Sequence, residues 1–306
     1  MTPVGGALDW DREGQQWPLR ETSRFVRSGH LVWHVQVLGP ENAPACLLVH
    51  GTGAASHSFR GLAPLLAKDW RVFVPDLPGH GFTRGTRRRD LTLPGMANAL
   101  SGLLATIDRA PAICIGHSAG TAILLHMCLE GQITPKKVFG INSALEAIPG
   151  NSILSPLAKI LFFNPFTSGA VALHARLGGL VTRLLKGTGS TIDRDGIDCY
   201  RLLISHPSHV KGALGMMANW DLDPLIAKLS HIQTPVNLIS AADDPMVPAR
   251  VSRSAARYLP SGQAASVKHG GHLVHEVDPG VVFQIIRDDL NAPAAEPQNK
   301  RLAKKG

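Results

Sequence analysis

Short, almost wholly apolar runs recur along the chain and limit the folds that it can adopt. Such runs are typical of strands buried on both faces of a sheet. Helical stretches separate the runs, so strand and helix alternate, which predicts a mostly parallel central sheet flanked by helices. The runs lie at residues 46–49, 72–74, 113–115, 138–141 and 236–239, and the helical stretches include residues 59–66, 96–107 and 119–129.

The alternation stops over one long segment late in the chain. Residues 142–225 are rich in Leu, Phe, Pro and Gly and predict several helices without strands between them. We interpret this segment as a helical lid inserted into a core formed by residues 1–141 and 226–290. Residues 291–306 carry too little apolar surface to pack and predict a flexible basic tail.

The charge and composition of the chain narrow its partners and location. Six basic residues of a chain with net charge +8 fall in two short runs, at 87–89 and 300–304, which are typical of solvated surface; an acidic partner or a membrane surface is the alternative. No nucleic-acid module accompanies these runs. The four cysteines have no CxxC spacing, and the N-terminal stretch is too polar for a signal peptide. We therefore expect a cytoplasmic protein with reduced cysteines and without a nucleic-acid partner.

The sequence Gly116-His117-Ser118-Ala119-Gly120 places a serine between a strand and a helix. A turn this tight needs residues that are almost free of side chain on both sides, and it exposes the serine hydroxyl as a nucleophile. The alternative is an ordinary strand-to-helix turn in which the serine only caps the helix. His117 is expected to point away from the serine and to have a structural role.

A serine nucleophile needs a base and an acid that orients the base. In folds with this turn the acid and then the histidine follow late strands. Asp244 lies in the rigid stretch Asp-Pro-Met-Val-Pro after residues 236–239, and His272 follows two glycines after a further strand at residues 264–268. Asp243 is the alternative acid. His269 is placed in the strand and His275 lies beyond the loop, so neither is preferred.

Two backbone N–H groups must stabilise the negative oxygen that develops during acyl transfer. Ala119, which follows the serine, supplies one of them. The loop His50-Gly51-Thr52-Gly53 after the apolar run 46–49 is expected to supply the other from Thr52, with Gly53 as the alternative. This loop lacks the lysine and the spacing of a phosphate-binding P-loop.

Five sequence motifs occur in the order typical of the α/β-hydrolase superfamily, and the chain resembles this superfamily over nearly all of residues 25–290. Within it, the chain looks like the BchO-type magnesium-chelatase accessory proteins of bacteriochlorophyll biosynthesis. The motifs are LLVHGTGA, VPDLPGHGFT, GHSAG, DPMVP and GGHLVHE, and the narrower likeness rests on WHVQ, HGTGAASHSFR, LPGMA, TGSTID and MMANWDL.

The resemblance implies an α/β-hydrolase fold and a catalytic triad of Ser118, Asp244 and His272. In some relatives the acid follows the preceding strand instead, but here that place, near Asn142, holds an amide. The resemblance also implies a role in pigment synthesis beside magnesium chelatase, whose tetrapyrrole substrates carry carboxylates that Arg87, Arg88 and Arg89 could meet.

The predicted lid carries a dense apolar run between residues 153 and 166. Such a surface suits a large flat apolar ligand or peripheral contact with a membrane, and the alternative is packing of the lid onto the core. Phe162, Met216, Trp220 and Gly53 are candidate pocket residues, and packing is again the alternative.

Two functions follow from the sequence. The first is hydrolysis of an ester or related acyl bond through an acyl-serine intermediate, as in a serine esterase. The second is a non-catalytic protein that binds or carries a porphyrin for magnesium chelatase. An esterase of broad specificity is a third interpretation. The sequence contains no metal-ligand cluster or nucleotide-binding motif, so we expect no cofactor and no bound metal.

Overall fold

The computed structural model describes residues 8–146, 164, 166–177 and 179–292. Eight strands form one sheet in the order β1-β2-β4-β3-β5-β6-β7-β8. The pairs β1–β2 and β2–β4 are antiparallel, and every other pair is parallel, as the alternation of strand and helix predicted. The strands are β1 Ser23–Ser28, β2 Leu31–Leu38, β3 Ala45–Val49, β4 Arg71–Pro75, β5 Ile113–His117, β6 Lys137–Ile141, β7 Val236–Ala241 and β8 Gly262–Val267.

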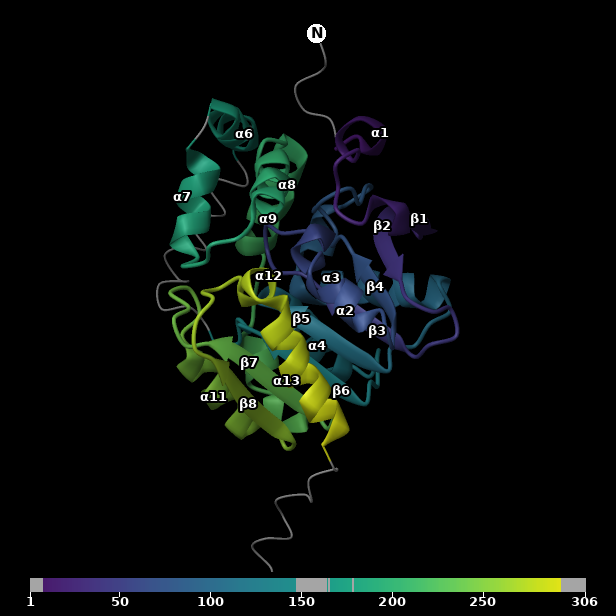
Figure 1. The fold of residues 1–306 in the computed structure, drawn as a ribbon. Helices are drawn as coiled ribbons and strands as arrows, with labels where there is room; N and C mark the ends of the chain where they lie inside the picture. Colours follow the sequence, from purple (N-terminus) through teal and green to yellow (C-terminus); the bar gives the residue numbers. More distant parts are fainter. Residues whose placement is uncertain (1–7, 147–163, 165, 178, 293–306) are drawn as a thin grey trace, which may run out of the picture.

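Helices cover both faces of this sheet (Figure 1). Successive residues of the central strands alternate between two hydrophobic clusters, because side chains along a strand point to opposite faces. Cys114 of β5 packs with α3 Leu93–Thr106, α4 Ala119–Leu129 and α11 Ala249–Tyr258. Ile113 and Ile115 pack on the other face with α2 Leu62–Leu66 and α13 Pro279–Asn291. Both faces are therefore apolar, which explains the unbroken apolar runs of the sequence.

Three local expectations were wrong. The stretch 59–66 is not one helix but the short turn η2 Ser56–Phe59 followed by α2, with Gly61 at the break, where a Cβ atom would lie 2.8 Å from Pro279. The strand β1 was missed because its sequence, SRFVRS, is mostly polar and only partly buried. His269 lies beyond the end of β8 rather than within the strand, since β8 ends at Val267.

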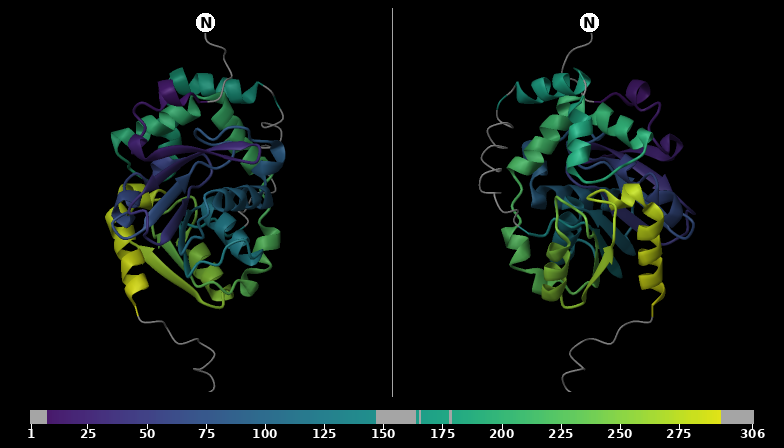
Figure 2. Two further views of the ribbon diagram at one scale, coloured as in Figure 1. Left: turned by 90° about the vertical axis from the view of Figure 1, so that its right-hand side faces the viewer. Right: turned by 60° about the vertical axis from the view of Figure 1, so that its left-hand side comes forward.

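Helices without intervening strands connect β6 to β7 in the described part of this segment, as the sequence predicted. The four longest of them, α6 to α9, gather over one end of the sheet (Figures 1 and 2), and we call these four helices the cap. Their inner residues pack on Ala54 and Leu273, which follow β3 and β8. The segment contains α6 Thr167–Leu177, α7 Leu180–Gly187, α8 Arg194–Ile204, α9 Pro207–Ala218, α10 Asp223–Ile226 and η4 Leu229–His231.

The exact division into core and lid stays a prediction. Asn142 and Ser143, the first residues of the expected lid, are fully buried at the end of β6 and lie with the core. Most of the apolar run 153–166, including Phe162, and most of the expected tail 291–306 lie outside the described residues. No helix in the described part of the chain has both the length and the apolar character needed to cross a membrane.

Candidate active site

Ser118 sits at the sharp turn between β5 and α4. Its backbone angles are φ 50° and ψ −118°, a region that residues with side chains rarely adopt and that costs about 1–3 kcal/mol. A Cβ atom on Gly116 would lie 2.5 Å from the backbone nitrogen of Thr121, and one on Gly120 would lie 2.1 Å from the carbonyl oxygen of Val49. The two glycines are thus required by the close approach of strand and helix, and the strained serine between them has the backbone expected of an exposed nucleophile.

The predicted base and acid lie in direct contact. His272 Nδ1 is 2.8 Å from Asp244 Oδ2, and both residues are buried. The other carboxylate oxygen of Asp244 accepts hydrogen bonds from the backbone N–H groups of Met246 at 2.8 Å and Val247 at 3.0 Å. These two bonds fix the plane of the carboxylate and aim its free oxygen at the imidazole.

Asp243, the alternative acid, has a different position. Its carboxylate accepts hydrogen bonds from the backbone N–H groups of Gly270 and Gly271, and its side chain is 41% exposed. It also lies 3.5 Å from the exposed ring of His269. Asp243 therefore shapes the loop that carries His272 without touching the His272 side chain in the described contacts.

The serine and the base are linked indirectly. Among the hydrogen bonds of the described residues, none joins the Ser118 hydroxyl to His272. His117, next to the serine, donates from Nε2 to the carbonyl oxygen of His272 at 2.9 Å, and the two rings have centroids 4.8 Å apart. Catalytic hydrogen bonds are often long before substrate binds. His117 therefore makes a structural contact, since it holds the backbone of the residue predicted to act as the base.

Asn142 anchors the loop that carries His272. Its backbone has φ 44°, a left-handed conformation that asparagine tolerates better than most residues. Its side-chain amide donates to the carbonyl oxygens of Gly271 at 2.9 Å and His272 at 2.8 Å, and its oxygen accepts from the backbone N–H of Ala241. The sequence revealed an amide at this place but not its function, which depends on three segments meeting at the sheet edge.

The segment between α7 and α8 also holds this loop. The backbone N–H of His272 donates to the carbonyl oxygen of Thr188 at 2.8 Å. The hydroxyl of Ser190 donates to the carbonyl oxygen of Gly270 and accepts from the backbone N–H of Leu273, each at 2.8 Å. The base is therefore positioned by contacts from both the core and the segment between α7 and α8.

The candidate oxyanion donors lie beside the serine turn. A Cβ atom on Gly51 would lie 3.0 Å from the Ser118 Cβ, so this loop approaches the serine. No hydrogen bond among the described residues has the backbone N–H of Thr52 or of Ala119 as its donor. The hydroxyl of Thr52 lies 3.2 Å from the Met216 sulfur, and the carbonyl oxygen of Gly53 is 3.1 Å from His209 Nε2. Both contacts come from α9, so this cap helix fixes the conformation of the loop after β3.

The other candidate pocket residues differ in their surroundings. Met216 is fully buried and contacts the Thr52 loop, so it lies next to the candidate site. Trp220 is half-buried and packs against the main hydrophobic cluster of the core, which fits the packing alternative. The described residues include no group of three or more His, Cys, Asp or Glu side chains that could hold a metal ion.

Comparison with known proteins agrees with this architecture. The model of the alpha/beta hydrolase family matches residues 46–285. The chain is 43% identical over 263 residues to the magnesium-chelatase 30 kDa subunit of Rhodobacter capsulatus, covering 85% of this chain and 92% of that protein. The chain belongs to the α/β-hydrolase family. The resemblance to the BchO-type proteins of this family, noted from the sequence motifs, is confirmed by the R. capsulatus relative.

Solved structures share this fold. An α/β-hydrolase fold protein from Burkholderia ambifaria superposes with a TM-score of 0.72 at 21% identity, covering 87% of this chain and 99% of that one. A thermophilic esterase from Thermogutta terrifontis superposes with a TM-score of 0.68 at 20% identity, covering 88% and 97%. At this level of identity the superpositions show a shared fold.

A buried carboxylate that the motif analysis did not single out lies behind the histidine loop of this α/β-hydrolase. Glu276 accepts hydrogen bonds from the hydroxyls of Ser58 at 2.9 Å and Tyr200 at 2.7 Å, and it pairs with Arg60. The second terminal nitrogen of Arg60 binds Asp193, the N-cap of α8, at 2.6 Å. Burial raises the pKa of Glu276, and the Arg60 guanidinium opposes that shift. The pair connects the core to α8.

A chain of contacts runs from this carboxylate to the candidate base. Because the Ser58 hydroxyl donates to Glu276, it accepts from His275 Nε2 at 2.7 Å. The His275 ring packs on His117 with centroids 4.3 Å apart, and His117 in turn binds the His272 carbonyl. The motifs HGTGAASHSFR and GGHLVHE contain Ser58, His275 and Glu276, so their presence was the available signal, but their partnership needed the fold.

We expect the buried histidines to make the folded protein less stable in mild acid. Burial lowers the pKa of His209 to about 4 and that of His275 to about 3. Burial also lowers the pKa of His57, His80 and His117 well below the usual value. The unfolded chain binds protons from about pH 6.5 downward, whereas these folded histidines do not, so stability falls with pH over this window.

We expect the free energy of unfolding to decrease by at least about 2 kcal/mol between pH 6.5 and 5.5, since His209 and His275 alone contribute about 1 kcal/mol each. Urea unfolding at both pH values measures this change. The variant His209→Gln should make the dependence less steep by about one proton, whatever its effect on stability at pH 7.5. A stability that is flat or rises as the pH falls would contradict neutral buried histidines.

Proposed function

We propose that this chain is a serine hydrolase that cleaves an ester or related acyl bond through an acyl intermediate on Ser118. The observation that carries this proposal is the pairing of a strained serine turn with a buried histidine whose Nδ1 lies 2.8 Å from Asp244. This is the arrangement that general-base activation of a serine requires.

In the proposed reaction, His272 takes the proton of the Ser118 hydroxyl as the oxygen attacks the acyl carbon. Asp244 keeps the hydrogen of His272 on Nδ1, so that Nε2 is free to accept this proton. The N–H groups of Thr52 and Ala119 stabilise the negative oxygen of the tetrahedral intermediate. The protonated His272 then donates its proton to the leaving group. In the second half of the reaction, His272 takes a proton from water as the water attacks the acyl carbon, and it returns a proton to the Ser118 oxygen as the acyl group leaves.

The R. capsulatus relative suggests the biological setting. That protein is named as a magnesium-chelatase subunit, and it shares 43% identity with most of this chain. We therefore propose that the chain acts with magnesium chelatase in (bacterio)chlorophyll biosynthesis, and that the substrate is a hydrophobic small molecule of the tetrapyrrole class.

A second candidate is a non-catalytic protein that binds a porphyrin for magnesium chelatase. Two observations favour it: the relative is named as a subunit of that enzyme, and the described structure contains no hydrogen bond between the Ser118 hydroxyl and His272. A fold that supports hydrolysis can be kept for binding alone.

A fluorophosphonate probe separates the two functions, because an activated serine attacks phosphorus and expels fluoride to form a stable phosphonyl-serine. We expect covalent labelling of Ser118, no labelling in Ser118→Ala, and a labelling rate at least about 10²-fold lower in His272→Ala. His269→Ala, which removes an exposed ring from the same loop, is the matched control and should label normally. Absence of labelling, or equal rates in His272→Ala and the control, would reject the hydrolase in favour of the binding protein.

Exposed apolar side chains in and next to the cap are candidates for peripheral contact with a membrane. Phe166 is 79% exposed, and Leu173 and Leu184 are also exposed. Apolar side chains of this size gain free energy on entering the membrane interface. We propose this contact as a route by which a hydrophobic substrate reaches the cap.

A further inference from the structure

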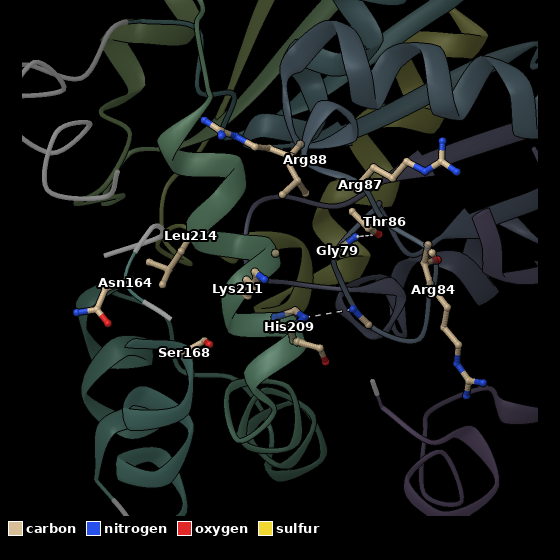
Figure 3. A pocket seen from close by; sticks show the side chains of 16 residues that line it. Gly79, Arg84, Thr86, Arg87, Arg88, Asn164, Ser168, His209, Lys211 and Leu214 are labelled. Atoms are coloured by element: carbon tan, nitrogen blue, oxygen red, sulfur yellow. Dashed lines mark hydrogen bonds between the residues drawn. The ribbon is translucent and has the colours of Figure 1, made fainter. Parts of the chain in front are cut away.

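A cavity of about 620 Å³ lies between the loop after β4 and the cap helices α6 and α9 (Figure 3). Its size falls in the range of small-molecule binding sites. It is distinct from the proposed triad, because Ser118, Asp244 and His272 are not among its lining residues. The lining consists of Gly79, Gly81, Thr83, Arg84, Gly85, Thr86, Arg87, Arg88, Leu91, Asn164, Ser168, Ser208, His209, Lys211, Gly212 and Leu214.

The charge of this cavity is entirely positive among the described lining residues. Arg84, Arg87 and Arg88 come from the loop and Lys211 comes from α9, and the described lining contains no Asp or Glu. Figure 3 shows Arg84, Arg87 and Arg88 spread around the rim with their guanidinium ends turned away from one another, and Lys211 nearer the middle. Arg84 also donates to the carbonyl oxygen of Leu8. Arg84, Arg87 and Lys211 place like charges around one cavity, and an anionic ligand would reduce the repulsion between them.

Arg89, the third residue of the run noted in the sequence, does not line the cavity. Its side chain is 71% exposed and lies 3.9 Å from Asp90. Asp90 is itself buried against His30 and the backbone N–H of Arg87. Of the three arginines in the run, only Arg87 and Arg88 line the cavity. Arg84 and Lys211 line it with them.

The walls of the cavity suit a flat apolar body. Gly79 and Gly212 cross so closely that a Cβ atom on Gly212 would lie 1.8 Å from the carbonyl oxygen of Gly79. These glycines leave bare backbone on one wall, and Leu91 and Leu214 add apolar side chains. The hydroxyls of Thr86, Ser168 and Ser208 supply further polar contacts around the cavity.

The cavity adjoins the proposed catalytic loop through α9. His209 lines the cavity, and its Nε2 atom contacts the carbonyl oxygen of Gly53. Met216, which contacts Thr52, follows Lys211 by five residues, or about 7.5 Å along the helix. A ligand in the cavity would thus lie within one or two helical turns of the oxyanion donors.

We propose that this cavity binds a flat apolar molecule bearing two or more carboxylates, with Lys211 and Arg87 binding the carboxylates. Porphyrins with two propionate groups belong to this chemical class. The inference rests on the tetrapyrrole class of ligand proposed above and deepens it, since it gives that ligand a place in a cavity outside the triad, and it holds for either an enzyme or a carrier.

Titration with protoporphyrin IX and with its dimethyl ester tests the proposal, using the Ser118→Ala protein so that binding is measured without turnover. We expect the diacid to bind at least about 10-fold more tightly than the ester, because hydrogen bonds between charged groups are the stronger ones. The double variant Lys211→Met/Arg87→Gln should weaken binding of the diacid by about 10- to 100-fold and leave binding of the ester unchanged.

Arg253→Gln/Arg257→Gln is the matched control, because it removes two exposed cations from α11 and keeps the same net charge as the double variant. It should bind both probes as the Ser118→Ala protein does. Equal binding of diacid and ester, or equal loss in the control, would overturn the proposal. Tight binding of inorganic pyrophosphate with no binding of the diacid would also overturn it and identify a phosphate site. None of these outcomes alters the fluorophosphonate test of the hydrolase.

Discussion

Asp244→Asn is expected to lower the rate of hydrolysis of short p-nitrophenyl esters by about 10⁴-fold. The structure gives the reason. The N–H groups of Met246 and Val247 both donate to one oxygen of the side chain, and an asparagine must keep its oxygen there. Its NH₂ group then faces His272 Nδ1, which can no longer carry hydrogen. The hydrogen moves to Nε2, and the imidazole cannot accept the serine proton.

Asp243→Asn is the matched control for this prediction. It makes the same chemical change one residue earlier, on a partly exposed side chain that binds only the loop N–H groups of Gly270 and Gly271 and lies near His269. We expect a loss of less than about 10-fold. If the control lost as much activity as Asp244→Asn, or if Asp244→Asn kept its activity, the assignment of Asp244 as the orienting acid would be wrong.

The second large effect is a loss of stability in Gly120→Ala, which is opposite in sign to the usual effect of a glycine-to-alanine change in a helix. Replacing glycine by alanine within a helix normally stabilises it by about 1 kcal/mol. In Gly120→Ala the new methyl group would lie 2.1 Å from the carbonyl oxygen of Val49 and 2.7 Å from that of His50, and neither backbone group can move freely. We expect a loss of about 3 kcal/mol, or a Tm lower by roughly 5 °C.

Gly169→Ala is the control for this effect. Gly169 lies in α6, and a Cβ atom there would contact nothing within 4 Å. This variant should be as stable as the wild type or slightly more so, as measured by thermal unfolding followed by circular dichroism. A Gly120→Ala protein that accumulates only in insoluble form agrees with the expectation, whereas wild-type stability would show that β3 and α4 can separate at this point.

The parts of the fold that the sequence predicted are those with a strong local signal. Strands buried on both faces contain an apolar run, such as residues 113–115 of Ile113–His117, and Ala119–Leu129 begins and ends as expected. β1 was missed because an edge strand needs no apolar run. Short segments such as 59–66 depend on a distant contact, here with Pro279, that no local pattern contains.

In the candidate site too, the predictable residues are those with a local sequence signal. Ser118 was predictable because its turn demands glycines close by in the sequence, and Asp244 and His272 follow strands that were themselves recognisable. The roles of Asn142 and Glu276 were not predictable, because each binds groups from segments far apart in the chain. The basic cavity was suggested by the arginine run, but Lys211 enters it from a helix more than a hundred residues away.

The position of Glu276 limits how the cap can open. Its carboxylate is sealed between Ser58 and Arg60 of the core and Tyr200 of α8. Swinging α8 outward would strip a donor from a buried anion, and a hydrogen bond to a charged group is worth about 1.5–3 kcal/mol. We therefore expect α8 to stay in place when the cap opens, and a bulky ligand to enter on the side of α6 and α7.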